Sequence, residues 1–427
     1  MLLISCFLCI FFAVIIYFVD GKKVINAKIL LLLLWGVVLF INYVNPYSWY
    51  PLVLQTEILV FISTLGMCVT FLCTKSIRRK VEAFKIDKTR LVFFFSIQFV
   101  LLLFLIPLFL KTLTFFINNN YDFALLRSYY VHNSGNDDVP FLSTAQRLFY
   151  VYYFIFPCCN ACVFINLLLS ASKKMWKFPL ILSLVFISLI TFITAARGNL
   201  LVLIIGFVVA FSCFPEHLTN RVKIAVFVIC LLSILLSITI TSSRSVGGSF
   251  LETTVTYFCG GIRLLNESLK SKATFGLDEY TFGVCTFAGP LAFISDFDRY
   301  FVGVLGFHFL PSNFSPYFIS QGQYFAEATY IGQHTLINAF PTYLYYFYRD
   351  GGVVWMLLMV CFLSYLVITV RNKFYKSSNL AYAYLFCALL YWMVMSVCWW
   401  EGIRLESFVS IVWGVLLSRM LIKKKRV

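Results

Sequence analysis

Charged side chains are scarce in this chain of 427 residues, since Asp, Glu, Lys and Arg make up 12% of it and hydrophobic residues make up 61%. Such a composition excludes a soluble globular protein. Acidic residues are scarcest, 18 against 34 Lys and Arg, which gives a formal net charge of +16. In a soluble protein this excess would suggest a nucleic-acid partner. Here the basic residues cluster in short loops between apolar runs, so we expect no nucleic-acid partner.

The sequence also lacks the short motifs of several enzyme classes. It has no nucleotide-phosphate loop, no HExxH helix and no Gly-x-Ser-x-Gly elbow. A reaction driven by a cytoplasmic nucleotide is therefore not expected. The fourteen cysteines lie mostly in apolar runs as small hydrophobic residues. Cys259 and Cys285 lie in the long segment described below and could form a disulfide, although buried single thiols are commoner.

Apolar runs of about 20 residues, the length that spans a bilayer, recur along the chain. We predict an all-α polytopic membrane protein with about 11 transmembrane helices. A carboxylate inside a span costs roughly 2.5 to 3.5 kcal/mol, so Glu57, about two turns into the third span, should face a polar partner. The predicted spans are 2–19, 29–44, 52–73, 91–117, 148–170, 178–193, 200–214, 224–241, 353–370, 380–399 and 405–422.

The basic clusters give the orientation of these spans. The strongest is KSIRRKVEAFKIDKTR at 75–90, and the chain ends in KKKR. Placing every cluster in the cytoplasm puts the N-terminus outside and the C-terminus inside. The predicted organisation is an N-terminal membrane bundle (1–241, with a moderate outer loop near 118–147), a large outer loop (242–352) that contains short interfacial helices, and a C-terminal bundle (353–427).

The run 331–348 is long enough to span on hydropathy alone. It contains Gln333, His334, Asn338 and Pro341, and a span here would invert the orientation of the basic clusters that follow. We therefore predict an interfacial or re-entrant helix on the outer surface.

The large outer loop mixes ionisable residues with many Tyr, Phe and Gly and with short apolar stretches. This mixture favours a pocket half in lipid and half in water, for a substrate with an apolar tail and a polar head. Without a nucleotide, the substrate must already be activated, and a lipid pyrophosphate is the usual solution. Arginine suits such a site, because its guanidinium binds phosphate oxygens bidentately and stays charged.

Five short motifs carry a resemblance to a known family. The motifs are TAARGNLL (194–201), SSRSVGG (242–248), YFCGGIRLLNESL (257–269), EYTFGVCTFAGPL (279–291) and NAFPTYLYYFYRDGG (338–352). Through them the chain resembles the oligosaccharide repeat unit polymerases, the Wzy-type O-antigen and capsule polymerases of the bacterial inner membrane.

The resemblance implies a metal-independent, GT-C-like membrane glycosyltransferase without a cofactor, and it makes the outer loop periplasmic. Such an enzyme transfers the growing glycan from undecaprenyl pyrophosphate onto a newly flipped, lipid-linked repeat unit. The implied partners are the undecaprenyl-pyrophosphate-linked oligosaccharide, membrane lipid, and the chain-length regulator and flippase of the same pathway. The Arg-x10-Gly pattern described for some relatives is not evident in this sequence.

The resemblance also implies that outer-loop arginines bind the pyrophosphate. Arg197, Arg244 and Arg263 match the motif arginines by position, and Arg127 and Arg299 are second-choice candidates. A base or hydrogen-bond acceptor on the acceptor hydroxyl is needed as well. The candidates for this role are Glu267, His308, Glu327 and His334.

Structural roles compete with these functional ones. Arg197 could snorkel to headgroups, Arg263 and Glu267 at i and i+4 could pair with each other, and His308 could be a satisfied buried histidine. Two other functions also remain open: an O-antigen ligase that transfers glycan to lipid A core, and a lipid-linked oligosaccharide flippase or other transporter.

Overall fold

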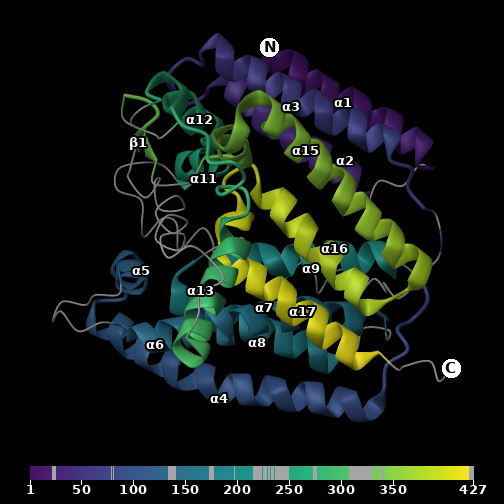
Figure 1. Cartoon of the computed structure of the whole chain (residues 1–427), viewed down its shortest axis with the longest axis vertical. Helices are drawn as coiled ribbons and strands as arrows, with labels where there is room; N and C mark the ends of the chain where they lie inside the picture. The colour runs from purple at the N-terminus through teal and green to yellow at the C-terminus, as the bar shows by residue number, and fades with distance from the viewer. Residues whose placement is uncertain are drawn as a thin grey trace. The chain divides into compact units, whose positions relative to one another are not determined.

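The computed structural model describes the chain except residues 22–25, 78, 80, 133–140, 173–176, 197, 215–223, 225–227, 229–230, 232–234, 236–249, 273–276, 307–328, 334, 338–340 and 423–427. Within the described residues the regular secondary-structure elements are helices apart from one two-stranded antiparallel sheet (Figure 1). The prediction of an all-α protein is therefore confirmed at this level.

The first half of the chain forms α1 (Leu2–Val19), α2 (Ala27–Val44), α3 (Leu54–Cys73), α4 (Lys88–Asn118), α5 (Phe123–His132), α6 (Thr144–Arg147), the π-helix η1 (Leu148–Tyr153), α7 (Ile155–Ser172), α8 (Lys177–Thr194) and α9 (Gly198–Cys213). The second half forms α11 (Phe250–Cys259), α12 (Gly261–Lys270), α13 (Ala288–Leu305), β1 (Thr329–Tyr330), β2 (Leu336–Ile337), α15 (Tyr343–Ser377), α16 (Leu380–Met395), the 3-10 helix η3 (Glu401–Ile403) and α17 (Leu405–Leu421).

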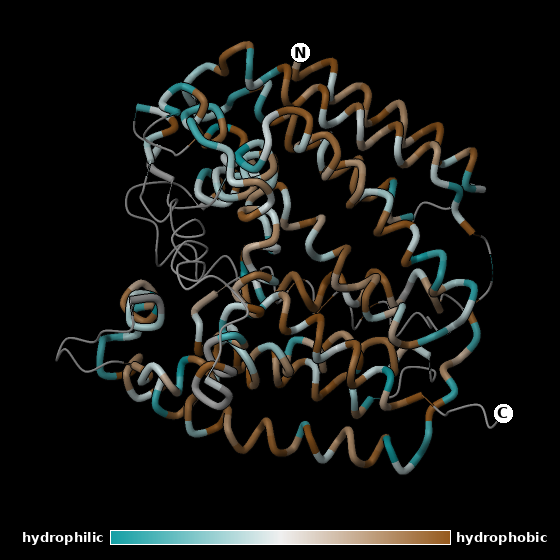
Figure 2. The backbone as a smooth tube through the Cα atoms, viewed as in Figure 1, coloured by the Kyte–Doolittle hydropathy of each residue, from teal (hydrophilic) through white to brown (hydrophobic). Residues whose placement is uncertain are grey.

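Helices form at the positions of ten of the eleven predicted spans, and most of the remaining one, 224–241, lies outside the described residues. In the part of the chain that the structure describes, seven helical segments are long and apolar enough to cross a membrane: 2–19, 27–44, 54–73, 88–118, 144–172, 177–194 and 343–377. Residues 198–210 and 380–395 form shorter apolar helices. Hydrophobic residues run along the long helices in Figure 2 and hydrophilic ones gather near their ends, an arrangement compatible with a polytopic membrane protein.

The predicted helix at 331–348 is wrong over its first part, because Leu336 and Ile337 form a strand, and within the described residues helix is present only from 343 onward. Thr329 pairs with Ile337 and Tyr330 with Leu336 in a short hairpin, and α15 begins only at Tyr343. Pro341 stands just before this helix, because proline is tolerated at a helix start but not in a helix interior. Residues 343–350 therefore form a helical segment that the non-helical backbone of Gly351 and Gly352 separates from the predicted span 353–370.

The chain divides into two compact units. Unit 1 comprises Met1–Ser76, Leu251–Thr369 and Trp392–Phe408. Unit 2 comprises Ile77–Phe250, Val370–Tyr391 and Val409–Val427. Unit 1 thus contains α1, α2 and α3 together with α11, α12, α13 and the hairpin of the predicted outer loop.

A buried ion pair fixes the ends of the first three helices in unit 1. Lys28 Nζ lies 3.2 Å from Asp20 Oδ2 and donates to the Thr74 carbonyl at 2.5 Å. Asp20 also accepts hydrogen bonds from Asn26 at 2.9 Å and Ser76 at 2.7 Å. Burial by itself would raise the pKa of Asp20, but these hydrogen bonds and the Lys28 charge outweigh it, so the pKa is lowered.

In unit 2, α7 is buried on nearly every side, as its apolar residues around the whole helix require. Gln98 of α4 and Asn166 of α7, both fully buried, exchange side-chain hydrogen bonds of 3.2 and 2.7 Å. Two reciprocal amide bonds of this kind satisfy polar groups that would be costly in an apolar surrounding.

Glu57 lies in the first turn of α3 and not deeper, so the predicted position two turns inside the span is wrong. Its side chain is 28% exposed, and its carboxylate lies 3.1 Å from the Met1 amino group.

Candidate functional site

The candidate site in unit 1 is built on α12, a short amphipathic helix from the predicted outer loop. Gly261 at its start is required by close packing, because a Cβ there would lie 2.9 Å from the Val397 carbonyl oxygen. Ile262, Leu265 and Leu269 are buried on one face of the helix. Lys270 in the last turn complements the helix dipole. The helix is therefore held firmly against its neighbours.

Arg263 joins α12 to the end of α2 and to the loop that follows it. Its Nε donates to Asn42 Oδ1 at 3.0 Å, its Nη1 to the Tyr50 carbonyl at 2.6 Å, and its Nη2 to the Asn42 carbonyl. The guanidinium also lies 5.6 Å from the centre of the Trp49 ring. The side chain is only 3% exposed, and burial lowers its pKa to about 10, partly offset by the negative charges of Glu57 and Glu267. All three guanidinium nitrogens are thus engaged by the protein.

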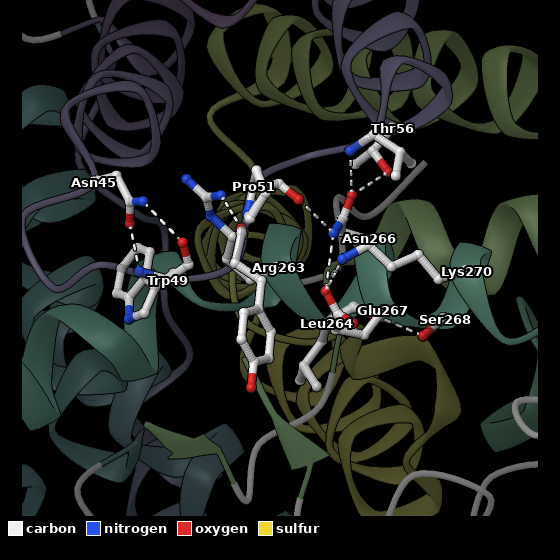
Figure 3. Close-up of polar contacts among 12 residues, drawn as sticks. Asn45, Trp49, Pro51, Thr56, Arg263, Leu264, Asn266, Glu267, Ser268 and Lys270 are labelled. Carbon is white, nitrogen blue, oxygen red and sulfur yellow. Dashed lines mark hydrogen bonds and ion pairs between the residues drawn. The ribbon is translucent and has the colours of Figure 1, made fainter. Parts of the chain in front are cut away.

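Asn266 makes a second set of buried contacts from the same helix (Figure 3). Its Oδ1 accepts the Val53 N–H at 2.7 Å and the Thr56 hydroxyl at 3.0 Å. Its Nδ2 donates to the Pro51 carbonyl at 3.2 Å and to Glu267 Oε1 at 3.0 Å. Because the side chain is completely buried, Asn266 both attaches α12 to the start of α3 and orients the neighbouring carboxylate.

Glu267 lies on the more open side of α12. Its Oε1 accepts hydrogen bonds from Asn266 and from Lys270 Nζ, the latter at 2.8 Å, and its side chain is 17% exposed. Among the described residues no donor reaches Oε2. The result is a carboxylate in a fixed orientation with one oxygen left to accept a hydrogen bond or a proton from a ligand. Lys270, 33% exposed, also lies 5.7 Å from the centre of the Tyr50 ring.

Arg263 and Glu267 do not pair with each other in this structure, although they are one turn apart. The guanidinium of Arg263 donates to Asn42 and Tyr50, whereas Glu267 pairs with Lys270. The structural alternative of a simple i, i+4 ion pair is therefore wrong. The structural role of Arg263 comes instead from long-range contacts to another helix end.

A second polar cluster in unit 1 surrounds Asp350, which precedes a break in α15 at Gly351–Gly352. Its buried carboxylate accepts the Thr281 hydroxyl at 2.5 Å and the N–H groups of Cys285 at 2.9 Å and Thr286 at 2.6 Å. Gly352 has φ +66°, and a Cβ there would lie 2.8 Å from the Tyr280 hydroxyl, so this position requires glycine. Asp350 thereby fixes residues 281–286 to the break in the helix.

A third cluster lies at the turn between α16 and α17, also in unit 1. Glu401 is completely buried and accepts hydrogen bonds from Trp399 Nε1 at 2.6 Å and from the Ser407 hydroxyl. Arg404 lies 3.8 Å from Glu401, donates through Nε to Glu406 at 2.7 Å, and lies 5.0 Å from the centre of the Trp399 ring. Its positive charge therefore has carboxylates on two sides.

Several of the predicted site residues lie outside the described residues: Arg197, Arg244, His308, Glu327 and His334. Arg299 belongs to α13, but its side chain is not described. Arg127 belongs to unit 2, where its Nη1 donates to the Thr194 carbonyl at the end of α8 at 2.9 Å and its guanidinium lies 5.6 Å from the centre of the Tyr130 ring. Of the predicted set, Arg263 and Glu267 are thus the two whose side chains the structure describes on the same helix, α12.

Sequence reasoning missed Asn266, Asp350 and Glu401. Asn266 and Asp350 stand inside quoted motifs, in LLNESL and YRDGG, but the chemistry of phosphate binding directed the choice to arginines. A buried Asn or Asp with several backbone partners is recognisable only when those partners are known.

Cys259 and Cys285 are both buried free thiols, so the disulfide considered from the sequence is not formed in this structure. Burial raises the pKa of Cys285 to about 11 and that of Cys259 to about 12. Within the described residues no group of three or more His, Cys, Asp and Glu side chains is arranged to hold a metal ion.

Comparison with models of known protein families, with curated proteins and with solved structures finds no match to the chain.

Proposed function

We propose that the chain is an O-antigen polymerase, a membrane glycosyltransferase that joins lipid-linked repeat units at the periplasmic face of the bacterial inner membrane. The observation that carries the proposal is the oriented carboxylate of Glu267. It lies on a helix that is too short to span a bilayer and that is attached to the ends of α2 and α3 by Arg263 and Asn266. The motif resemblance supplies the substrate class.

In the proposed reaction a hydroxyl oxygen of the acceptor sugar forms a bond to the anomeric carbon of the donor glycan. The bond between that carbon and the pyrophosphate oxygen breaks, and its electron pair leaves with undecaprenyl pyrophosphate. Glu267 accepts the hydroxyl proton through Oε2. Because pyrophosphate is a good leaving group, cations beside it supply much of the remaining stabilisation.

Within this proposal Arg263 is a positioning residue, because its guanidinium is already engaged by Asn42 and Tyr50. Binding of the leaving pyrophosphate is then assigned to Arg197 and Arg244, and Arg299 and Arg127 are second-choice candidates. The repeat unit would arrive from a flippase, and a chain-length regulator would act as a further partner.

The proposal is tested by complementation in the source organism. The gene is deleted and restored as wild type, Glu267→Gln or Glu267→Asp, each at verified membrane expression, and lipopolysaccharide is separated on a gel. Glu267→Gln keeps the shape and one acceptor oxygen but removes the basic carboxylate, so a single-repeat band should replace the ladder. Glu267→Asp should retain part of the ladder. The matched control is Glu82→Gln, which neutralises an exposed carboxylate of the predicted cytoplasmic connector.

The same gel separates the competing functions. Core-only lipopolysaccharide with long lipid-linked glycan accumulating would identify a ligase. Loss of periplasmic lipid-linked repeat units would identify a flippase. An unchanged ladder for Glu267→Gln would reject Glu267 as the acceptor-activating group.

A further inference from the structure

The turn at residues 280–287 in unit 1 exposes a phenylalanine in an unfavourable backbone conformation. Phe282 has φ +47°, in the left-handed region that a bulky side chain rarely adopts, and Gly283 follows at φ +93°. The Phe282 side chain is 84% exposed, the highest value among the exposed large hydrophobic residues of the described structure. The left-handed backbone conformation favours Gly or Asn at this position. The high exposure of the ring means that packing in a protein core does not explain a phenylalanine here either.

The turn is held in this conformation by residues on both sides of the break in α15, Asp350 before it and Trp355 after it. The Phe282 N–H donates to the Asp350 carbonyl at 3.0 Å, and Trp355 Nε1 donates to the Thr286 hydroxyl at 3.2 Å. A Cβ on Gly283 would lie 3.5 Å from the Trp355 ring. Together with the Asp350 carboxylate bonds described above, these contacts fix the direction in which Phe282 points.

One face of α15 carries an exposed apolar stripe, which begins at Val354 directly before Trp355. Val354, Leu358, Phe362 and Tyr365 follow one another at helical spacing and are between 49% and 71% exposed. They belong to a helix long and apolar enough to cross a membrane. In such a helix an exposed apolar stripe faces hydrocarbon, and Phe282 extends from a turn packed on the start of this same helix.

We propose that the 280–287 turn is a membrane-contact element and that Phe282 inserts its ring into the hydrocarbon region of the bilayer. The occupant of this surface is therefore phospholipid, as it is for the adjoining stripe on α15. Asp278 and Glu279, both exposed and just before the turn, mark its water-facing side. An aromatic ring on one side and carboxylates on the other set the depth of the turn at the interface.

Photocrosslinking of the full chain tests the proposal. The photoreactive analogue benzoylphenylalanine replaces Phe282, Val354 or Glu279 in separate variants. Each is reconstituted into nanodiscs of one synthetic phosphatidylcholine, irradiated, and analysed by mass spectrometry for covalent lipid adducts. Position 354 is the lipid-facing reference and position 279 the water-facing control. We expect the adduct yield at 282 to match that at 354 and to exceed clearly that at 279.

Two results would overturn the proposal. One is a yield at 282 no higher than at 279 while 354 still labels lipid. The other is an adduct at 282 that forms only when a polyprenyl-pyrophosphate-linked glycan is added, which would assign the surface to substrate and not to bulk phospholipid.

A second variant keeps the test independent of crosslinking. Phe282→Asn suits the left-handed backbone, so its Tm in detergent should equal or exceed that of the wild type, while reconstitution should leave the turn more accessible to water-soluble protease. A clear fall in Tm would show that the ring packs on protein, and the proposal would then be wrong.

Discussion

Replacing Asn266 by Ala should destabilise unit 1 without touching the exposed surface. The completely buried amide makes four hydrogen bonds, to Val53, Thr56, Pro51 and Glu267. A hydrogen bond of this kind contributes about 0.5 to 1.5 kcal/mol, and a buried group left without a partner costs about 1 to 3 kcal/mol. The hydroxyl of Thr56 can rotate to another acceptor, whereas the Val53 N–H cannot. We therefore expect a loss of about 3 kcal/mol in the free energy of unfolding.

The assay is equilibrium unfolding in mixed micelles, with the helical circular dichroism followed as sodium dodecyl sulfate is added. The matched control on the same helix is Lys270→Ala, which removes a partly exposed ion pair and should lower the free energy of unfolding by about 0.5 kcal/mol. Asn266→Asp adds a diagnostic case, because it keeps the acceptor oxygen but places a second carboxylate beside Glu267 and faces the Pro51 carbonyl without a donor. If Asn266→Ala unfolds within about 0.5 kcal/mol of the wild type, the proposed role of this amide in holding α12 is refuted.

Three further predictions follow from buried polar contacts. Arg263→Lys cannot satisfy both acceptors of Asn42 and the carbonyl of Tyr50, so we expect polymer formation to fall in parallel with the amount of folded protein, measured by size-exclusion chromatography. The pKa of Asp20 is lowered in the folded state, so its contribution to stability is complete above about pH 4 and is lost as the pH falls through the folded pKa. Asp20→Asn should therefore remove this loss of stability in acid, measured as the free energy of unfolding over a series of pH values. Gln98→Leu should lower the free energy of unfolding by about 1 kcal/mol, and a double-mutant cycle with Asn166→Leu should show coupling.

Each of these predictions has a result that would contradict it. For Arg263→Lys, the opposing outcome is an undiminished yield of folded protein with no ladder, which would return Arg263 to the pyrophosphate site. For Asp20→Asn it is an acid limb identical to that of the wild type. For Gln98→Leu it is additivity with Asn166→Leu, which would mean that the two amides do not interact.

The long apolar helices could be predicted from the sequence because they depend on local properties. A run of apolar residues near bilayer length favours a helix wherever it lies, since hydrocarbon leaves the backbone no other partner. The boundaries of α1, α2 and α4 accordingly lie within a few residues of the predicted ones. The short helices of the predicted outer loop were also expected. The hairpin at 329–337 was not, because its second strand lies inside the run predicted as a helix and its first strand lies just before that run.

The candidate site could be predicted only in part. Arg263 and Glu267 were chosen from their motif, but the partners of Arg263 lie 213 to 221 residues away in sequence. No local pattern indicates that Asn42 and Tyr50 occupy the guanidinium. Likewise the acceptor role of Asp350 depends on backbone N–H groups 64 and 65 residues earlier.

The sequence by itself determined that this is a helical chain with repeated membrane-length apolar segments, because composition and run length act on each segment independently of the others. Only the tertiary structure decided which polar side chains are available for chemistry. Burial and long-range hydrogen bonds engage Arg263 and Asn266 in holding α12, leave one oxygen of Glu267 open, and direct Phe282 away from the protein. Such outcomes depend on contacts between distant parts of the chain, and no single stretch of sequence contains them.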